Sequence, residues 1–269
     1  MENETANNDC RKGPISGNAL KLIACAAMLT DHIGMLLFPT VLILRAIGRL
    51  AMPLFAFTAA EGFYYTRRKL VHFLTMLAVG LAVSAVLSFA EGAMHFDILI
   101  TFSLSAFVAY ALQNVKKYAF ALDGANTAAS VVALIAAVAL CVFVCIGAKV
   151  EYGIAGVMLP VTVRLTDFRS YGAQGLLERI DTFAARVICF TLGLVAVSLS
   201  LGTLQWLCLL SVPLIALYNG SKGKAKLKYF FYIFYVGHFA VLGLVYSLLH
   251  PEILHEAMNR LFSFYLNNL

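Results

Sequence analysis

The amino-acid sequence predicts an all-α integral membrane protein, a single polytopic bundle of about nine transmembrane helices, with eight as the alternative. Two observations predict this class. Hydrophobic residues make up 61% and charged residues 13% of the 269 positions, against roughly 45–50% and 25% in soluble domains. The apolar residues also form long runs, and the uncharged run 128–148 exceeds the ~18 residues that indicate a spanning helix. A β-barrel would instead alternate apolar and polar residues.

The apolar runs divide the chain into three parts. Residues 1–16 are polar and are expected to form a disordered cytoplasmic N-terminus, without the pattern of a signal peptide. Residues 17–249 are expected to form one transmembrane domain. Residues 250–269 repeat apolar positions at helical spacing, which predicts an amphipathic helix in the membrane interface. The expected spans are 17–38, 41–63, 70–90, 97–114, 128–147, 149–165, 183–201, 204–218 and 228–249.

Basic residues alternate between the two ends of these spans. Lysine and arginine gather before the first span and after the second, fourth, sixth and eighth, and the connections between are nearly free of them. The pattern predicts a multi-pass protein of the bacterial cytoplasmic membrane with a cytoplasmic N-terminus. It also accounts for the formal net charge of +6, so lipid and not nucleic acid is the expected partner. The six cysteines form no C-x-x-C pair, and no metal site is expected.

The first expected span contains Lys21, Asp31 and His32, and ionisable groups at membrane depth are costly. Lys21 and His32 are eleven positions apart, which is three helical turns plus about 20°, so both should leave one face roughly 16 Å apart. Lys21 would lie at the cytoplasmic mouth, where snorkelling to headgroups is the alternative role. His32 would lie deeper, either as a hydrogen-bonded core residue or as a proton-transfer group.

The second expected span carries Arg45 and Arg49, which are four apart and therefore share a face. Pro53 has no N–H, so the carbonyl of Arg49 loses its helical partner and the span should kink there. If the first two spans are antiparallel neighbours, Asp31 should pair with Arg45 or Arg49. Glu61 should then pair with Lys21 near the cytoplasmic side. Charge compensation alone is the alternative role for Arg45 and for Glu61.

Weaker candidates lie near the ends of other spans and in the last one. Candidate acceptor contacts are His95, Asp97, Tyr152 and His238. His238 should lie near mid-depth of the last span, as a structural histidine or a second catalytic group. The basic turn after the eighth span contains Asn219 and Lys222. It could hold phosphates through backbone N–H groups and lysine, or be an ordinary solvated loop.

Five segments together resemble the TraX family, named for the F-pilin acetylase of conjugative plasmids: "LKLIACAAMLTDHIG", "LRAIGRLAMPLFAFTAAEGF", "EYGIAG", "PLIALYNGSKG" and "KYFFYIFYVGH". They occur in order between about Leu20 and Leu249. The family is thought to N-acetylate pilin with acetyl-CoA. It is also similar to membrane acyltransferases of the acyltransferase-3 type, whose first span carries an Arg, ten residues and a catalytic His. The resemblance implies that His32 is the base and Lys21, in place of Arg, a coenzyme A contact.

The resulting hypothesis is an acyl-CoA-dependent acetyltransferase that acts on an amine or hydroxyl of a pilin-like protein N-terminus or of an envelope glycan or lipid. Lys21, with Glu61 and the basic turn nearby, would bind acetyl-CoA. Arg49, or Arg45, would stabilise the oxyanion, and Asp31 would hold His32 or Arg49 in place. The alternative is a transporter or flippase for an anionic solute, with the two arginines as its binding pair. A non-catalytic assembly factor is a third possibility.

Overall fold

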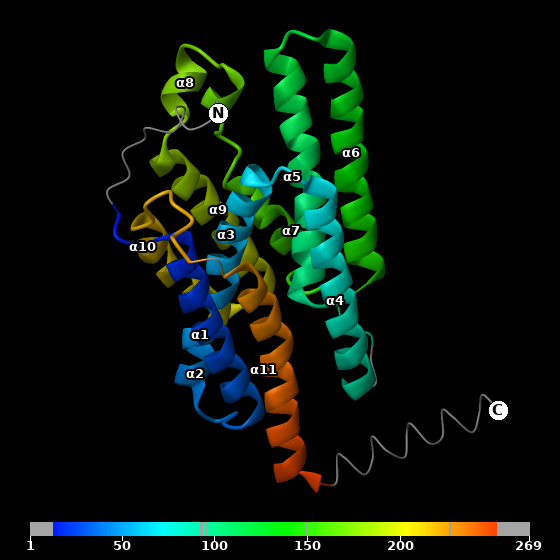
Figure 1. Ribbon diagram of the computed structural model, residues 1–269, viewed down its shortest axis with the longest axis vertical. Helices are drawn as coiled ribbons and strands as arrows, with labels where there is room; N and C mark the ends of the chain where they lie inside the picture. Colours follow the sequence, from blue (N-terminus) through cyan, green and yellow to red (C-terminus); the bar gives the residue numbers. More distant parts are fainter. Residues whose placement is uncertain (1–12, 92–93, 95, 149, 226, 252–269) are drawn as a thin grey trace, which may run out of the picture.

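The computed structural model describes all residues except 1–12, 92–93, 95, 149, 226 and 252–269. In the described part the chain is helical, and its helices run up and down one long axis (Figure 1). The α-helices are α1 (Gly17–Leu36), α2 (Leu42–Gly48), α3 (Ala51–Tyr65), α4 (Lys69–Glu91), α5 (Ile98–Phe120), α6 (Gly124–Gly147), α7 (Gly153–Thr162), α8 (Leu176–Ile180), α9 (Phe183–Leu201), α10 (Ser211–Ala216) and α11 (Lys228–Leu249). Two 3-10 helices are η1 (Arg169–Tyr171) and η2 (Thr203–Leu210).

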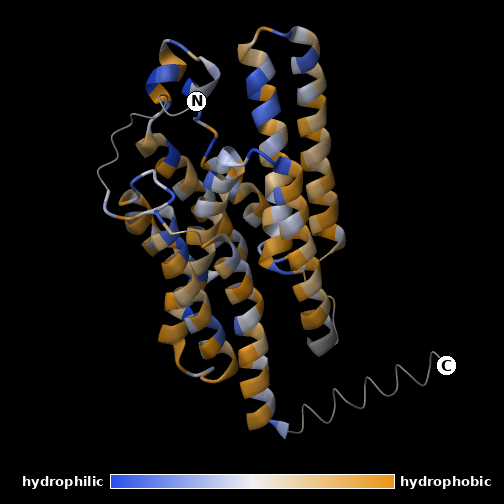
Figure 2. Ribbon diagram, in the orientation of Figure 1, coloured by the Kyte–Doolittle hydropathy of each residue, from blue (hydrophilic) through white to orange (hydrophobic). Residues whose placement is uncertain are grey.

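Seven helical segments among the described residues are long and apolar enough to cross a membrane: α1, α2 with α3, α4, α5, α6, α9 and α11. Figure 2 shows apolar residues along the middle of these helices and hydrophilic residues gathered around α8 and the neighbouring loops. The expected sixth and eighth spans contain only shorter helices, α7 and η2 with α10. Pro160 and Pro213 lie in these segments, and each removes a backbone donor from a continuous helix.

The shorter segment that contains α7 connects opposite ends of the bundle. Near the start of α5, the Thr101 hydroxyl donates to the Glu151 carbonyl at 2.7 Å, and near its end Lys116 Nζ donates to the Arg164 carbonyl at 2.7 Å. The segment that contains α7 therefore runs along α5. We call the end of the bundle where α1 begins the Lys21 end, and the opposite end, where α1 meets α2, the His32 end.

The second expected span is broken where the proline predicts. Helix α2 ends at Gly48 and α3 begins at Ala51, so Arg49 and Leu50 lie between two helical segments. Pro53 cannot donate to the carbonyl of Arg49, which is the expected cause of the break. The break confirms the predicted kink and places Arg49 at a turn instead of inside a regular helix.

Helices α1 and α2 approach each other closely through two glycines. A Cβ atom at Gly48 would overlap the side chain of Asp31, and one at Gly34 would lie 2.7 Å from Cβ of Leu44. Only residues without a side chain fit at these positions, because real Cβ atoms do not come so close to their neighbours. This close approach places the carboxylate of Asp31 next to Arg45 and Arg49.

The ends of the expected transmembrane domain differ in part from the sequence prediction. Ile15 was expected in the disordered segment, yet its N–H donates to the Leu217 carbonyl at 3.1 Å, and Ser16 caps α1 by accepting from the Ala19 N–H. The segment just before α1 is therefore held against the chain after α10. The expected interfacial helix 250–269 lies outside the described residues from position 252 onward.

We predict that Gly48→Ala lowers the stability of the protein, because the added methyl group overlaps Asp31 and forces α1 and α2 apart. Overpacking of this kind costs about 1–3 kcal/mol. The midpoint of thermal unfolding in detergent should fall. Gly147→Ala is the matched control, since a Cβ there meets nothing within 4 Å. An equal effect of both substitutions would contradict the close approach of the two helices.

Candidate active site

A pair of histidines joins α1 to α11 near the middle of α11. Nδ1 of His32 lies 2.9 Å from Nε2 of His238, and Nδ1 of His238 lies 3.0 Å from the carbonyl oxygen of Phe234. The two rings stack with centroids 5.0 Å apart, and Phe239 packs against His32 at 4.7 Å. Two histidines that lie 206 positions apart in the sequence thus form one hydrogen-bonded unit.

The hydrogen bonds determine which nitrogen of His32 accepts a proton. A carbonyl oxygen can only accept, so Nδ1 of His238 carries the hydrogen that bonds to Phe234. In the neutral ring Nε2 of His238 is then an acceptor, and Nδ1 of His32 must be the donor to it. This assignment leaves the lone pair on Nε2 of His32 as the basic site of the pair.

Asp31 binds both arginines of the second expected span, as the sequence predicts. Its Oδ2 lies 3.0 Å from Nη1 of Arg45 and its Oδ1 lies 3.5 Å from Nη2 of Arg49. Nη1 of Arg49 also donates to Oε1 of Gln205, a residue of helix η2, at 3.3 Å. Two guanidinium groups against one carboxylate leave a net positive charge, and both lie within electrostatic range of His32.

Donors remain available beside this positive centre. Within the described part of the chain, Nε of Arg49 and Nε2 of Gln205 are buried and have no hydrogen-bond partner. Buried polar groups are nearly always hydrogen-bonded, so each exception calls for an explanation. A bound substrate oxygen is one group that these donors can satisfy.

Other predicted acceptor contacts lie around the His32 end. Tyr152, which has a left-handed backbone (φ 62°), precedes α7 and lies within electrostatic range of Asp31 and Arg49. Asp97 is buried: it caps α5 by accepting from the Leu99 N–H, and its Oδ2 accepts from the Tyr235 hydroxyl at 2.7 Å.

His95 lies outside the described residues. Its expected place beside an acceptor therefore stays a prediction from the sequence.

At the Lys21 end, the ammonium of Lys21 lies 5.4 Å from the centre of the Phe231 ring of α11. Lys21 and His32 therefore both face α11, as their spacing predicts. Lys21 lines a cavity of about 130 Å³, and Met28 and Tyr235 also line it. His32 is not among the lining residues, whereas Met28, one helical turn before it, is.

The basic turn after α10 packs onto the start of α1. The Ser221 and Lys222 carbonyls accept from the first amides of α1 at 2.8 and 2.9 Å, and Oδ1 of Asn219 accepts from the Ser221 N–H at 2.9 Å. Lys222 lies within electrostatic range of Lys21. The turn therefore adds a second positive charge beside Lys21, while its backbone carbonyls are hydrogen-bonded to α1.

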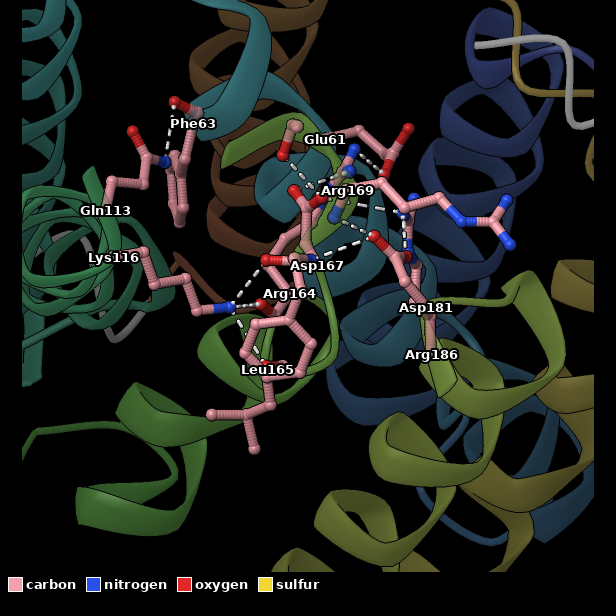
Figure 3. Close-up of polar contacts among 12 residues, drawn as sticks. Glu61, Phe63, Gln113, Lys116, Arg164, Leu165, Asp167, Arg169, Asp181 and Arg186 are labelled. Atoms are coloured by element: carbon pink, nitrogen blue, oxygen red, sulfur yellow. Dashed lines mark hydrogen bonds and ion pairs between the residues drawn. The ribbon is translucent and has the colours of Figure 1, made fainter. Parts of the chain in front are cut away.

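Glu61 does not pair with Lys21, and that prediction was wrong. Its Oε1 lies 2.5 Å from Nη2 of Arg164 (Figure 3). Its Oε2 accepts from the Tyr218 hydroxyl at 3.2 Å. Arg164 lies 103 positions further along the chain, and the turn after α7 brings it to α3. The pairing of Glu61 with Lys21 was inferred from local spacing, which cannot reveal a contact between residues so far apart in the sequence.

Glu61 belongs to a network of ion pairs that holds the loop before α9. Asp167 pairs with Arg164 at 3.3 Å and with Arg186 at 3.6 Å, and Arg186 pairs with Asp181 at 2.6 Å. Burial would raise the pKa of Asp181, but hydrogen bonds from the Arg169 and Phe168 backbone and from Arg186 lower it. Lys116 adds hydrogen bonds to three carbonyls of the same loop (Figure 3). The charges balance, which indicates a structural role.

Two features of the site were missed by sequence reasoning. His72 of α4 lines the Lys21 cavity, with Nδ1 3.0 Å from the Tyr110 hydroxyl. An ionisable residue inside an apolar run was a signal that could have singled it out. Gln205, 3% exposed, meets Arg49, and no local pattern marks it. No group of three potential metal ligands occurs in the part of the chain that the structure covers.

We predict that Glu61→Gln lowers the free energy of unfolding by about 3–5 kcal/mol, because it leaves Arg164 buried without its carboxylate. Urea unfolding in detergent measures the change. The double variant Glu61→Leu with Arg164→Leu removes both charges and should recover most of the loss. If the double variant is as unstable as the sum of its single variants, the two residues are not coupled.

Comparison with known proteins gives the family. The family model described as TraX protein matches residues 16–246. A segment of 45 residues is 53% identical to an uncharacterized protein of Rickettsia prowazekii (strain Madrid E), which corresponds to 17% of this chain and only 18% of the Rickettsia protein. No solved structure matches the chain. Because the family model covers most of its length, the chain belongs to the TraX family.

Proposed function

We propose that this protein is a membrane-embedded acyltransferase that moves an acetyl group from acetyl-CoA to an amine or hydroxyl acceptor. The acceptor is a protein N-terminus or a molecule of the cell envelope. Membership in a family associated with pilin acetylation supports a transferase. The observation that carries the proposal is the basic Nε2 of His32. It lies beside the net positive arginine pair, and His32 follows by one helical turn a residue that lines the cavity beginning at Lys21.

The donor enters at the Lys21 end in this proposal. Lys21 and Lys222 supply positive charge for the phosphates of coenzyme A, with Asn219 holding the turn that carries Lys222. The thioester end of the coenzyme's narrow arm passes Lys21 and enters the cavity. Hydrophilic residues gather at this end of the bundle (Figure 2), and its lysines and arginines suit the cytoplasmic face of a bacterial membrane, where acyl-CoA is present.

Proton transfer is assigned to the histidine pair. As the acceptor nitrogen or oxygen attacks the thioester carbon, its proton passes to Nε2 of His32. The carbon–sulfur bond then breaks, and the departing thiolate of coenzyme A takes up the proton. Nδ1–H of His32 stays bonded to His238 throughout, which keeps the ring in position while it carries a positive charge. General-base catalysis of this kind contributes typically 10²–10⁴ in rate.

In this proposal Arg49 stabilises the negative charge that develops on the thioester oxygen. Its Nε and the amide of Gln205 are buried donors without partners among the described residues, and Asp31 fixes the guanidinium from one side. Arg45 shares that carboxylate and adds to the positive potential. Removing one such donor from an enzyme costs about 10²–10³ in kcat.

The thioester reaches His32 only after Met28 moves. Met28 lines the cavity and is buried, and it precedes His32 by one turn on the same face of α1. Methionine is unbranched and adopts several rotamers with little cost. A change of rotamer at Met28 is therefore enough to open a path between the cavity and the histidine pair.

We predict that His32→Ala abolishes acetyl transfer, with a loss of about 10²–10⁴ in rate because the proton acceptor is gone. Membrane vesicles containing the protein are supplied with [¹⁴C]acetyl-CoA, and label in protein and in lipid extracts is counted. His250→Ala, at the end of α11, is the control and should retain activity. Undiminished transfer by His32→Ala would remove this mechanism.

We predict that His238 acts as a positioning residue, which a matched pair of substitutions can test. His238→Gln keeps an acceptor for Nδ1–H of His32 and should retain much of the rate. His238→Leu removes the acceptor and should lower kcat at least tenfold while the KM for acetyl-CoA stays unchanged. The same assay provides both constants. Equal rates in the two variants would show that the hydrogen bond does not orient the base.

A further inference from the structure

The cavity that begins at Lys21 is lined by residues of five helices, α1, α3, α4, α5 and α11. Most of its wall is apolar, with Met76 and Phe102 among the lining residues. The polar lining residues are Lys21, His72 and the hydroxyl-bearing Thr58, Tyr232 and Tyr235. Lys21 is on the α1 side, and His72 is on the α4 side, where Tyr110 holds its ring by a hydrogen bond.

The volume of the cavity indicates the size of the group that fits inside it. It measures about 130 Å³, and an engineered protein cavity of about 150 Å³ accommodates benzene. The cavity therefore has room for about six non-hydrogen atoms. An acetyl group with its thioester sulfur and the next two carbons is of that size, whereas a long acyl chain is far larger.

We propose that this cavity holds the thioester end of a short-chain acyl donor, and that Gly62 and Met76 limit the length of the acyl chain. The proposal rests on the proposed acyltransferase function and adds the acyl-chain preference to it. Charge and polarity favour a thioester over a lipid tail, because an alkyl chain forms no ion pair with the Lys21 ammonium and no hydrogen bond with the His72 imidazole. A donor with phosphates, an amide and a thioester carbonyl can bind both.

Gly62 and Met76 control the free space in different ways. A Cβ at Gly62 would lie 3.9 Å from Cε1 of His72, an ordinary contact, so a side chain there can extend into the cavity without overlap. Met76 is 5% exposed and forms part of the wall, so shortening it enlarges the cavity. One methylene group in an apolar pocket changes selectivity about 10–200-fold.

The test measures binding without an acceptor. Purified full-length protein in lipid nanodiscs binds [¹⁴C]acetyl-CoA, and unlabelled acetyl-, propionyl-, butyryl- and hexanoyl-CoA compete. For the wild type, the competitor constant should rise at least tenfold between acetyl- and butyryl-CoA. Gly62→Leu should weaken acetyl-CoA binding at least tenfold. Met76→Ala should improve binding of butyryl- or hexanoyl-CoA at least tenfold.

Two control variants match the size of these changes away from the cavity. Gly243→Leu lies on α11, where a Cβ meets nothing within 4 Å, and Met35→Ala lies at an exposed position of α1. Both should keep the wild-type order of competitors. Thermal unfolding of each variant identifies loss of binding through misfolding, and Gly62→Leu and Met76→Ala give independent results if one of them is unstable.

The outcomes separate this inference from the proposed function. If acetyl-CoA binds to the wild type but the chain-length order is the same in Gly62→Leu and Met76→Ala, the cavity assignment is wrong and the acyltransferase proposal stands. If acetyl-CoA does not bind to the wild type at all, the proposed function fails as well. Co-purification of a lipid with the wild type and its loss from Gly62→Leu would assign the cavity to a lipid tail instead.

Discussion

The cost of placing charge inside a lipid-embedded bundle governs the arrangement of this protein. An ionisable side chain in such surroundings persists only with a partner, and the ion pairs described above fall in two centres. Asp31 joins two arginines at the His32 end, and Glu61 joins Arg164 at the Lys21 end. The helices between them are apolar, so these contacts determine which helices are neighbours and at what depth the polar groups lie.

The irregular segments of the fold follow from the same constraint. The segment with α7 and the segment with η2 and α10 are too short to form regular spanning helices, yet they pass between the two centres. Non-helical backbone at membrane depth is tolerated where protein surrounds it. Here the side chain of Lys116 satisfies three carbonyls of the loop after α7, and the Thr101 hydroxyl satisfies the Glu151 carbonyl before it.

Local spacing was sufficient to predict part of the geometry of the candidate site. The period of a helix placed Lys21 and His32 on one face, the order of the first two spans paired Asp31 with the arginines, and Pro53 located the break. The partners of His32 and Glu61 could not be predicted, because His238 and Arg164 are 206 and 103 positions away. The sequence contains no period that relates such distant residues, and only the packing of α11 and of the turn after α7 brings them together.

The distance between the two histidines along the chain has a consequence for biosynthesis. His32 lies in the first spanning helix and His238 in the last one that the structure describes, so the pair cannot form until synthesis has passed α11. The Lys21 cavity has the same requirement, because Phe231 and Tyr232 of α11 close one of its sides. A nascent chain that has inserted only its earlier helices therefore lacks both the histidine pair and one wall of the cavity, and it acquires them only when α11 enters the bilayer.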